Sequence, residues 1–322
     1  MKHLILVGAC YLDTILTVPH FPAEDSKLRA TALHVRRGGN CPNSLEVLAQ
    51  LVLSGAGGPQ IKLHLVSCLP DAGAAATRKI LSSFGGGDGN DVSGNGGGAD
   101  IVDCSHCLYR AGHEAPASSY IIRSGATGSR TIVNFSDLPE VTADEFEGIA
   151  DVFAAAAAAA EQHGDDGGWW HFEGRIPETT LRCIRYLRRV TPGCTISVEV
   201  EKPNREGLVE LAAEADVVFY SRSWAEPRAH NCGSLSQGRS GVIQEGGAGA
   251  LALPGGEYIH HAAAPSGDGI AVVDTIGAGD TFIAAMLYGL HADAWSLEAR
   301  LEFGVTLATK KVQREGFAGL VP

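Results

Sequence analysis

The segment 274–282, with the sequence DTIGAGDTF, combines glycines, acidic residues and the start of a helix. Glycine has no Cβ, so a backbone turn built from it can come close to a ligand. The apolar residues that follow have helical spacing and predict a helix over 277–290. The free N–H groups at the start of a helix attract anions. The segment therefore predicts an anion site, in which the turn Gly277-Ala278-Gly279 would stabilise the charge of a phosphoryl group in transfer.

Asp280 falls in the first turn of that helix, within reach of whatever the anion site holds. A carboxylate in this place could accept the proton of an attacking hydroxyl group. An ordinary helix start would look similar, because acidic residues are favourable in a first turn. The sequence has no G-x-x-x-x-G-K-[ST] motif, and no G-x-G-x-x-G follows the first strand. Local chemistry leaves the catalytic and the structural interpretation open.

Composition narrows the class of protein. The chain has 322 residues, 45% of them hydrophobic, which is enough for one large α/β domain. Its net charge of −12 argues against a broad nucleic-acid surface, and no apolar stretch is long enough to span a membrane. The eight cysteines show no paired framework, so we expect reduced thiols and a cytoplasmic protein. Cys104, His106 and Cys107 lie close together, but no second cluster completes a metal site, and we interpret them as ordinary side chains.

The elements that must position these residues alternate along the chain. Strand patterns occur at 4–7, 63–66, 169–172, 195–200 and 217–220, and helical patterns at 43–53, 178–190, 206–215 and 297–311. Such alternation predicts a mostly parallel sheet with helices on both faces. An extended segment over 270–274 would lead into the glycine turn.

Two further segments, about 14–37 and 117–135, have the pattern of exposed strands. We expect them to form a small β-flap, or lid, on a single domain that spans 1–322. Residues 85–98 are almost entirely Gly, Asp, Asn and Ser, which predicts a flexible surface insertion.

The segment 274–282 resembles the C-terminal motif of the PfkB (ribokinase-like) carbohydrate kinases, and the turn Gly38-Gly39-Asn40 through Asn43 resembles their N-terminal motif. More narrowly, the chain resembles the ketohexokinases. The matching stretches span nearly the whole chain and lie at 8–13, 22–26, 36–44, 129–139, 171–175, 197–203, 217–221 and 316–321.

The resemblance implies a ribokinase-like three-layer sandwich that transfers the γ-phosphoryl group of ATP to a ketohexose such as fructose. It implies Asp280 as the general base and the Gly277–Gly279 turn as the anion hole. ATP and Mg²⁺ would be the cofactors, with K⁺ left open, and the lid would make a homodimer.

The resemblance also assigns binding residues. The sugar would be bound by Asp13, Gly39, Asn40, Asn43 and Lys202, with Asp25 reaching the sugar of a partner subunit. The nucleotide would be bound by Arg130, Gln244, Glu245, Gly246, Gly247, Gly277 and Gly279. Glu199 and Glu201 alternate with valines on one face of a strand end, where they could hold Mg²⁺ through water.

The region 222–249 departs from the ketohexokinases, because it is about ten residues short and poor in apolar residues. We predict that 240–245 still forms a strand beside 217–220, since Val242 and Ile243 are β-branched. Residues 225–239 would then be loop-like. Two alternatives stay open: a PfkB kinase for another sugar or a nucleoside, and a non-catalytic sugar-binding relative.

Overall fold

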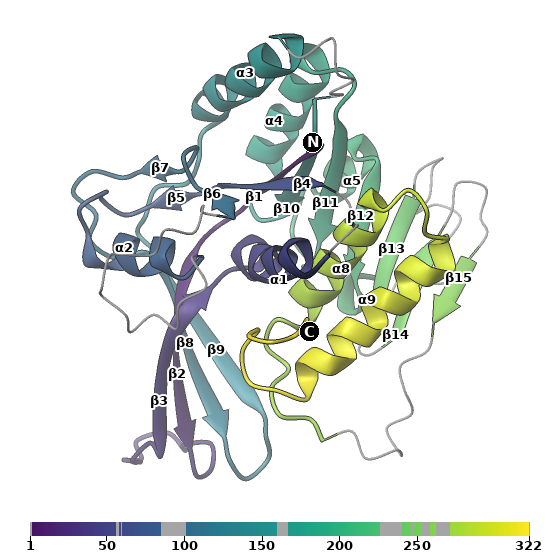
Figure 1. Ribbon diagram of the computed structural model, residues 1–322. Coiled ribbons are helices and arrows are strands. Elements are labelled where there is room, and N and C mark those ends of the chain that lie inside the picture. The colour runs from purple at the N-terminus through teal and green to yellow at the C-terminus, as the bar shows by residue number, and fades with distance from the viewer. Residues whose placement is uncertain are drawn as a thin grey trace.

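The computed structural model describes residues 2–55, 58, 60–84, 101–159, 167–225, 240–245, 248–252, 258–261 and 271–321 (Figure 1). The predicted insertion 85–98 and residues 226–239 of the predicted loop 225–239 lie outside these residues, as do Gly246 and Gly247. Ala225, the first residue of that predicted loop, is helical instead.

The core of the molecule is a nine-stranded sheet, ordered β15-β14-β13-β12-β11-β10-β1-β4-β6. Its strands are β1 (Lys2–Val7), β4 (Ile61–Val66), β6 (Val102–Asp103), β10 (Trp169–Glu173), β11 (Thr195–Val200), β12 (Val217–Ser221), β13 (Ser240–Glu245), β14 (Ala248–Ala252) and β15 (Tyr258–His261). Neighbours from β13 to β6 are parallel, whereas β14 and β15 are antiparallel. The predicted α/β class is confirmed.

Helices cover both faces of this sheet (Figure 1). One layer contains α1 (Asn40–Ser54), α2 (Ala75–Ser82), α8 (Ala278–His291) and α9 (Leu297–Val312), and the other contains α3 (Ala143–Ala159), α4 (Pro177–Val190), α5 (Leu208–Glu214) and α6 (Arg222–Ala225). Strand alternation divides the core: Leu4 and Leu6 pack with the first layer, Ile5 and Val7 with the second.

The lid is a separate four-stranded sheet, ordered β3-β2-β8-β9, that extends away from the core (Figure 1). Its strands are β2 (Tyr11–Val18), β3 (Ala32–Gly38), β8 (Ala117–Ser124) and β9 (Arg130–Phe135), with β2 and β8 parallel to each other. A two-stranded ribbon, β5 (Cys68–Leu69) and β7 (Leu108–Tyr109), completes the described strands.

The predicted strand in the short region is confirmed. β13 pairs in parallel with β12, from Ser240 beside Val217 to Gln244 beside Ser221. The backbone groups of β12 therefore have a ladder on each side, which satisfies buried N–H and C=O groups that would otherwise cost free energy.

One predicted element boundary was wrong. Helix α1 begins at Asn40 rather than at Asn43, because Pro42 is tolerated in a first turn, where its missing N–H would have no partner. The lead into the glycine turn was predicted as an extended segment over 270–274, and the described residues 271–274 join no sheet. Instead, the N–H groups of Val273 and Asp274 donate to the carbonyl of Val312, at the end of α9.

Within the described part of the chain, none of the helices combines the length and the apolar character that a membrane crossing needs.

Candidate active site

A cleft of about 1050 Å³ lies between the lid and the carboxyl ends of the central strands. Ligands collect at this edge in open parallel sheets. Most of the predicted site residues line it, from both the lid and the core: Asp13, Gly39, Asn40, Asn43, Arg130, Glu199, Glu201, Lys202, Gly277, Ala278, Gly279 and Asp280.

The glycine turn has the geometry of an anion site. Gly277 is the N-cap of α8 and has φ 79°, and a Cβ there would lie 2.2 Å from the Phe317 ring, so only glycine fits. The N–H and the hydroxyl of Thr281 both donate hydrogen bonds to the carbonyl of Gly277. Within the described ranges, the N–H groups of Gly279 and Asp280 have no acceptor, so they can bind an anion in the cleft.

Asp280 is buried beside this turn and is held by α1. The side-chain amide of Asn43 donates to Asp280 Oδ2 at 2.7 Å, and the Ser44 hydroxyl donates to the Asp280 carbonyl at 3.0 Å. Burial raises the pKa of Asp280 to about 7, the charges of Glu201 and Asp13 raise it as well, and the bond from Asn43 opposes them. A carboxyl group with a pKa near neutrality is suited to exchange protons with a substrate.

More carboxylates converge from neighbouring strand ends. The side-chain amide of Asn40 donates to both carboxylate oxygens of Glu199, at 2.9 and 3.0 Å. Glu173 accepts a hydrogen bond from the Ala9 N–H at 3.0 Å. Burial and then the charge of Asp280 hold the pKa of Glu199 well above its usual range. Burial raises the pKa of Glu173 to about 7. Acidic side chains crowded in this way would be stabilised by a bound cation.

Gly39 brings α1 to this cluster. Its φ is 102°, and a Cβ there would lie 2.1 Å from the carbonyl oxygen of Ala9, so a side chain would push β1 and α1 apart. The close approach sets Asn40 and Asn43 against the strand ends that carry Glu199 and the helix that carries Asp280.

Three lid arginines contact the segment that leads to the glycine turn. Arg130 donates to the Thr275 hydroxyl, Arg123 donates to the carbonyl of Val273, and Arg36 pairs with Asp274 at 3.3 Å. The lid thus contacts the segment that leads into the anion site. Lys202, whose side chain is half exposed, pairs with Glu201 at 3.0 Å at the rim of the cleft.

One predicted site residue, Asp25, does not line the cleft, and four others are not placed by what the structure describes. Asp25 is exposed in the lid turn 23–26 and is the one non-glycine residue of the described chain with positive φ, at 55°. Gln244 and Glu245 end β13, but the positions of their side chains lie outside what the structure describes, as do Gly246 and Gly247 entirely. The adenine side of the predicted nucleotide site therefore stays a prediction.

Asp274 and Lys311 were not recognised as site residues from the sequence. Lys311 is fully buried, and its ammonium group lies 3.1 Å from Asp274 Oδ2, while Asp274 Oδ1 accepts from the Ile276 N–H at 2.9 Å. This pair fixes the glycine turn to α9. The sequence did contain a signal for this pair: Lys311 lies on the apolar face of the helix predicted over 297–311. A lysine buried in this way requires a buried partner of opposite charge.

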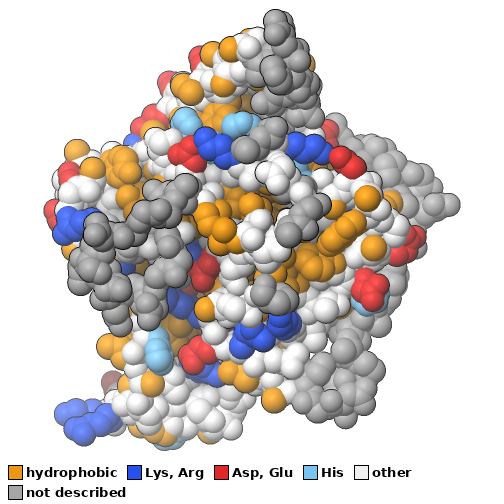
Figure 2. Space-filling view, viewed as in Figure 1, with side chains coloured by type: hydrophobic (Ala, Val, Ile, Leu, Met, Phe, Trp, Pro, Cys, Tyr) orange, Lys and Arg blue, Asp and Glu red, His pale blue; other side chains and the backbone are white. Residues whose placement is uncertain are grey.

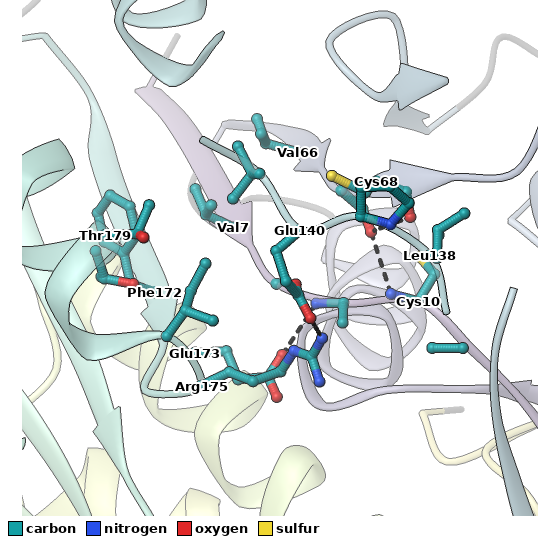
Figure 3. A pocket seen from close by; sticks show the side chains of 18 of the residues that line it. Val7, Cys10, Val66, Cys68, Leu138, Glu140, Phe172, Glu173, Arg175 and Thr179 are labelled. Carbon is teal, nitrogen blue, oxygen red and sulfur yellow. Dashed lines mark hydrogen bonds and ion pairs between the residues drawn. The ribbon is translucent and has the colours of Figure 1, made fainter. Parts of the chain in front are cut away.

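Arg175 was also not predicted, and it joins the lid to the core. It follows β10, donates to the Tyr11 hydroxyl at 2.7 Å and pairs with Glu140 in the segment after β9. Figure 3 shows this pair beside Glu173, at the wall of a second, small cavity of about 40 Å³. That cavity is next to the cleft and is lined mainly by apolar groups, so we assign it no chemistry.

Comparison with known proteins agrees with this geometry. The model of the pfkB family carbohydrate kinases matches residues 99–322. The chain belongs to the pfkB family of carbohydrate kinases. It is an ATP-dependent carbohydrate kinase, and it is 29% identical to the ketohexokinase of Mus musculus over a 338-residue alignment that covers 99% of both chains.

Solved structures share the fold of this carbohydrate kinase. Ribokinase from Thermotoga maritima superposes with a TM-score of 0.71 at 17% identity, covering 100% of this chain and 96% of that one. Ribokinase from Arabidopsis thaliana, solved with ribose and ATP, superposes with a TM-score of 0.67 at 18% identity, covering 100% and 96%. These likenesses show the ribokinase-like fold.

Proposed function

We propose that this carbohydrate kinase phosphorylates a hydroxyl group of a ketohexose such as fructose, with Asp280 as general base. The observation that carries the proposal is the contact between Asp280 and Asn43 at the start of α8, where a buried carboxylate adjoins free N–H groups. The side-chain amide oxygen of Asn43, Oδ1, is buried and accepts no hydrogen bond from the described residues. A neighbouring hydroxyl of the sugar would supply a donor to it, while the reacting hydroxyl presents its oxygen to the anion site and its proton to Asp280. The resemblance to mouse ketohexokinase supports a ketohexose as the acceptor.

In the proposed reaction, the sugar hydroxyl oxygen forms a bond to the γ-phosphorus of ATP as the bond from that phosphorus to the β-bridging oxygen breaks. The hydroxyl proton passes to Asp280, and ADP leaves. The N–H groups of Gly279 and Asp280 stabilise the negative charge of the transferring group, and Arg130 approaches it from the lid. Asp13 and Asn40 line the same cleft and would orient the other sugar hydroxyls.

The donor set fits Mg²⁺. Glu199 and Glu201 offer carboxylate oxygens, the hard ligands that this ion prefers, and Asn40 already orients Glu199. Mg²⁺ that they hold through water would neutralise charge on the phosphates. Repulsion from the charges of Asp280 and Glu201 is one of the causes that raise the pKa of Glu199. Bound Mg²⁺ would weaken this repulsion and so lower the pKa of Glu199.

The pH dependence of catalysis follows from the pKa of Asp280. Only the deprotonated carboxylate accepts a proton, so kcat/KM for the sugar should fall about tenfold per pH unit below about pH 7 and level off above it. Because the charge of Glu201 raises the pKa of Asp280, Glu201→Gln should move the midpoint to lower pH. Steady-state rates across this range check both, and a profile that is flat from pH 5 to 8 would remove Asp280 from the role of base.

A thermal-shift titration with ATP and Mg²⁺ tests the nucleotide site. A ligand at a hundredfold excess over its Kd should add about 2.7 kcal/mol to the free energy of unfolding. We expect stabilisation by ATP with Mg²⁺, because β13 completes the sheet beside β12. Stabilisation by fructose alone, with none by ATP, would favour a non-catalytic sugar-binding protein.

We further propose a homodimer that forms through the lid. The outer face of the lid sheet, away from the cleft, exposes a contiguous set of apolar side chains from adjacent strands: Leu16, Leu33, Val35, Tyr120 and Val133. An open sheet face of this kind needs a cover in solution. A second lid would cover it, and Asp25 on the lid turn would then reach the partner's sugar.

Val133→Glu should therefore yield monomers with a raised KM for the sugar, because Val133 is 60% exposed on this face, on the edge strand β9. Light scattering measures the mass and steady-state kinetics the KM. Val209→Glu changes an equally exposed valine on α5 and should leave the dimer intact. A fully active wild-type monomer at high concentration would contradict the proposal.

We place the kinase in the cytosol. Cys10, Cys41, Cys68, Cys107 and Cys183 carry free thiols, as expected in a reducing compartment.

A further inference from the structure

A cluster of two histidines and one aspartate lies at the β6 edge of the central sheet. His64 on β4 is paired in register with Asp103 on β6, and His106 follows in the next turn. One ligand atom from each of the three lies within 4.8 Å of the other two. None of the three lines the catalytic cleft. On the face shown in Figure 2, histidine side chains gather next to acidic and basic ones below α3.

His64 contributes a buried ring nitrogen that makes no hydrogen bond and can act as a metal ligand. Its side chain is 2% exposed, and its Nδ1 makes no hydrogen bond. Asp103 Oδ2 lies 3.4 Å from that atom, outside hydrogen-bonding geometry. Two ligands of a tetrahedral Zn²⁺ ion with bonds of about 2.0–2.2 Å stand about 3.4 Å apart. The pair therefore has the spacing of two atoms that share a metal ion.

The surroundings hold the ligands in place. His3 Nδ1 lies 2.9 Å from His64 Nε2, and a bond donated by this Nε2 leaves the lone pair of His64 Nδ1 facing Asp103. Ser105 donates its N–H and its hydroxyl to Asp103 Oδ1, which turns Oδ2 toward His64. The Phe153 ring packs against the rings of both His64 and His106.

Two features of the neighbourhood select the kind of ion. Cys104 and Cys107 pack with the core on the other face of the sheet, so the thiols do not join the cluster. Imidazole nitrogens with one carboxylate suit a first-row transition ion rather than Mg²⁺. Lys62, whose side chain is about half exposed, pairs with Asp103 Oδ2 at 3.3 Å and would have to swing away from a bound cation.

We propose that His64, Asp103 and His106 bind one Zn²⁺ ion, with water as the fourth ligand. The ion ties β6, a two-residue edge strand, to β4 and to the turn that carries His106. It acts on the stability of this edge and is separate from the cation proposed in the cleft.

The test is Zn²⁺ titration of the full chain after removal of metals, against a chromophoric chelator. We expect one ion per chain in the wild type, and binding weaker by about 100-fold or more in His106→Ala and Asp103→Asn, since losing a ligand should cost at least as much as losing its supporting partner. His113→Ala, a histidine of the same segment, should bind as the wild type does. Lys62→Gln should bind about fivefold more tightly, because a competing positive charge is gone.

Circular dichroism establishes that each variant is folded, and the Co²⁺-substituted wild type gives a readout that needs no variant. Its visible spectrum should be that of nitrogen and oxygen ligands. An absence of stoichiometric binding, equal binding by the wild type and both ligand variants, or a thiolate-to-cobalt charge-transfer band would overturn the proposal.

Discussion

Asp280→Asn should lower kcat by about 10²–10⁴-fold while nucleotide binding is largely retained, because the variant loses the proton acceptor and keeps the anion site. Asparagine has the shape of aspartate, and its carbonyl oxygen can still accept from Asn43. The Ser44 hydroxyl bonds the backbone carbonyl at this position and is unaffected. Steady-state assays with ATP, Mg²⁺ and fructose measure the loss.

The same variant should fold at least as well as the wild type. Asp280 is buried, and the charges of Glu201 and Asp13 raise its pKa, so removing its charge relieves repulsion. An unchanged or higher melting temperature, together with ATP-dependent stabilisation, would show that the lost rate is chemical. Turnover like that of the wild type would refute the assignment of the base.

Asp274→Asn should lower the free energy of unfolding by about 3–5 kcal/mol, because it leaves the ammonium group of Lys311 buried without its counter-charge. The change also weakens the bond to the Ile276 N–H, which shapes the glycine turn. We therefore expect a raised KM for ATP as well. Urea denaturation measures the first effect and initial rates the second.

Asp293→Asn is the matched control. Asp293 pairs with Lys2 at 3.3 Å, but both side chains are mostly exposed, and such pairs add little to stability. Equal stabilities for the two variants would mean that the pair of Lys311 and Asp274 does not hold the turn.

Much of the fold could be predicted because the hydrophobic pattern along the chain agrees with the strands and helices of the structure. Runs such as 217–220 are apolar on both faces, as is typical of a buried parallel strand, and the described helices lie between such runs. The strand β13 was predicted from two β-branched residues, Val242 and Ile243, and from the need of β12 for a neighbour. Local chemistry left the role of the glycine turn open, and the turn was recognised through its resemblance to the C-terminal motif of the PfkB kinases.

The remainder depends on contacts between residues far apart in the chain. Asn43 and Asp280 are separated by 237 positions, and only the packing of α1 against α8 reveals their hydrogen bond. The pairing of His64 with Asp103 depends on strand register, which no local pattern around either residue fixes. The start of α1 was missed because the apolar positions with helical spacing, from Leu45 onward, mark only the later turns of the helix.

The most direct test of the central claim is a substrate panel at saturating ATP and Mg²⁺, with fructose, tagatose, ribose and adenosine as acceptors. ADP release and the phosphorylated product are both quantified for the wild type. The account predicts the highest kcat/KM for a ketohexose, with one ADP formed per sugar phosphate. Preferred transfer to ribose or adenosine, or no transfer to any acceptor, would contradict it.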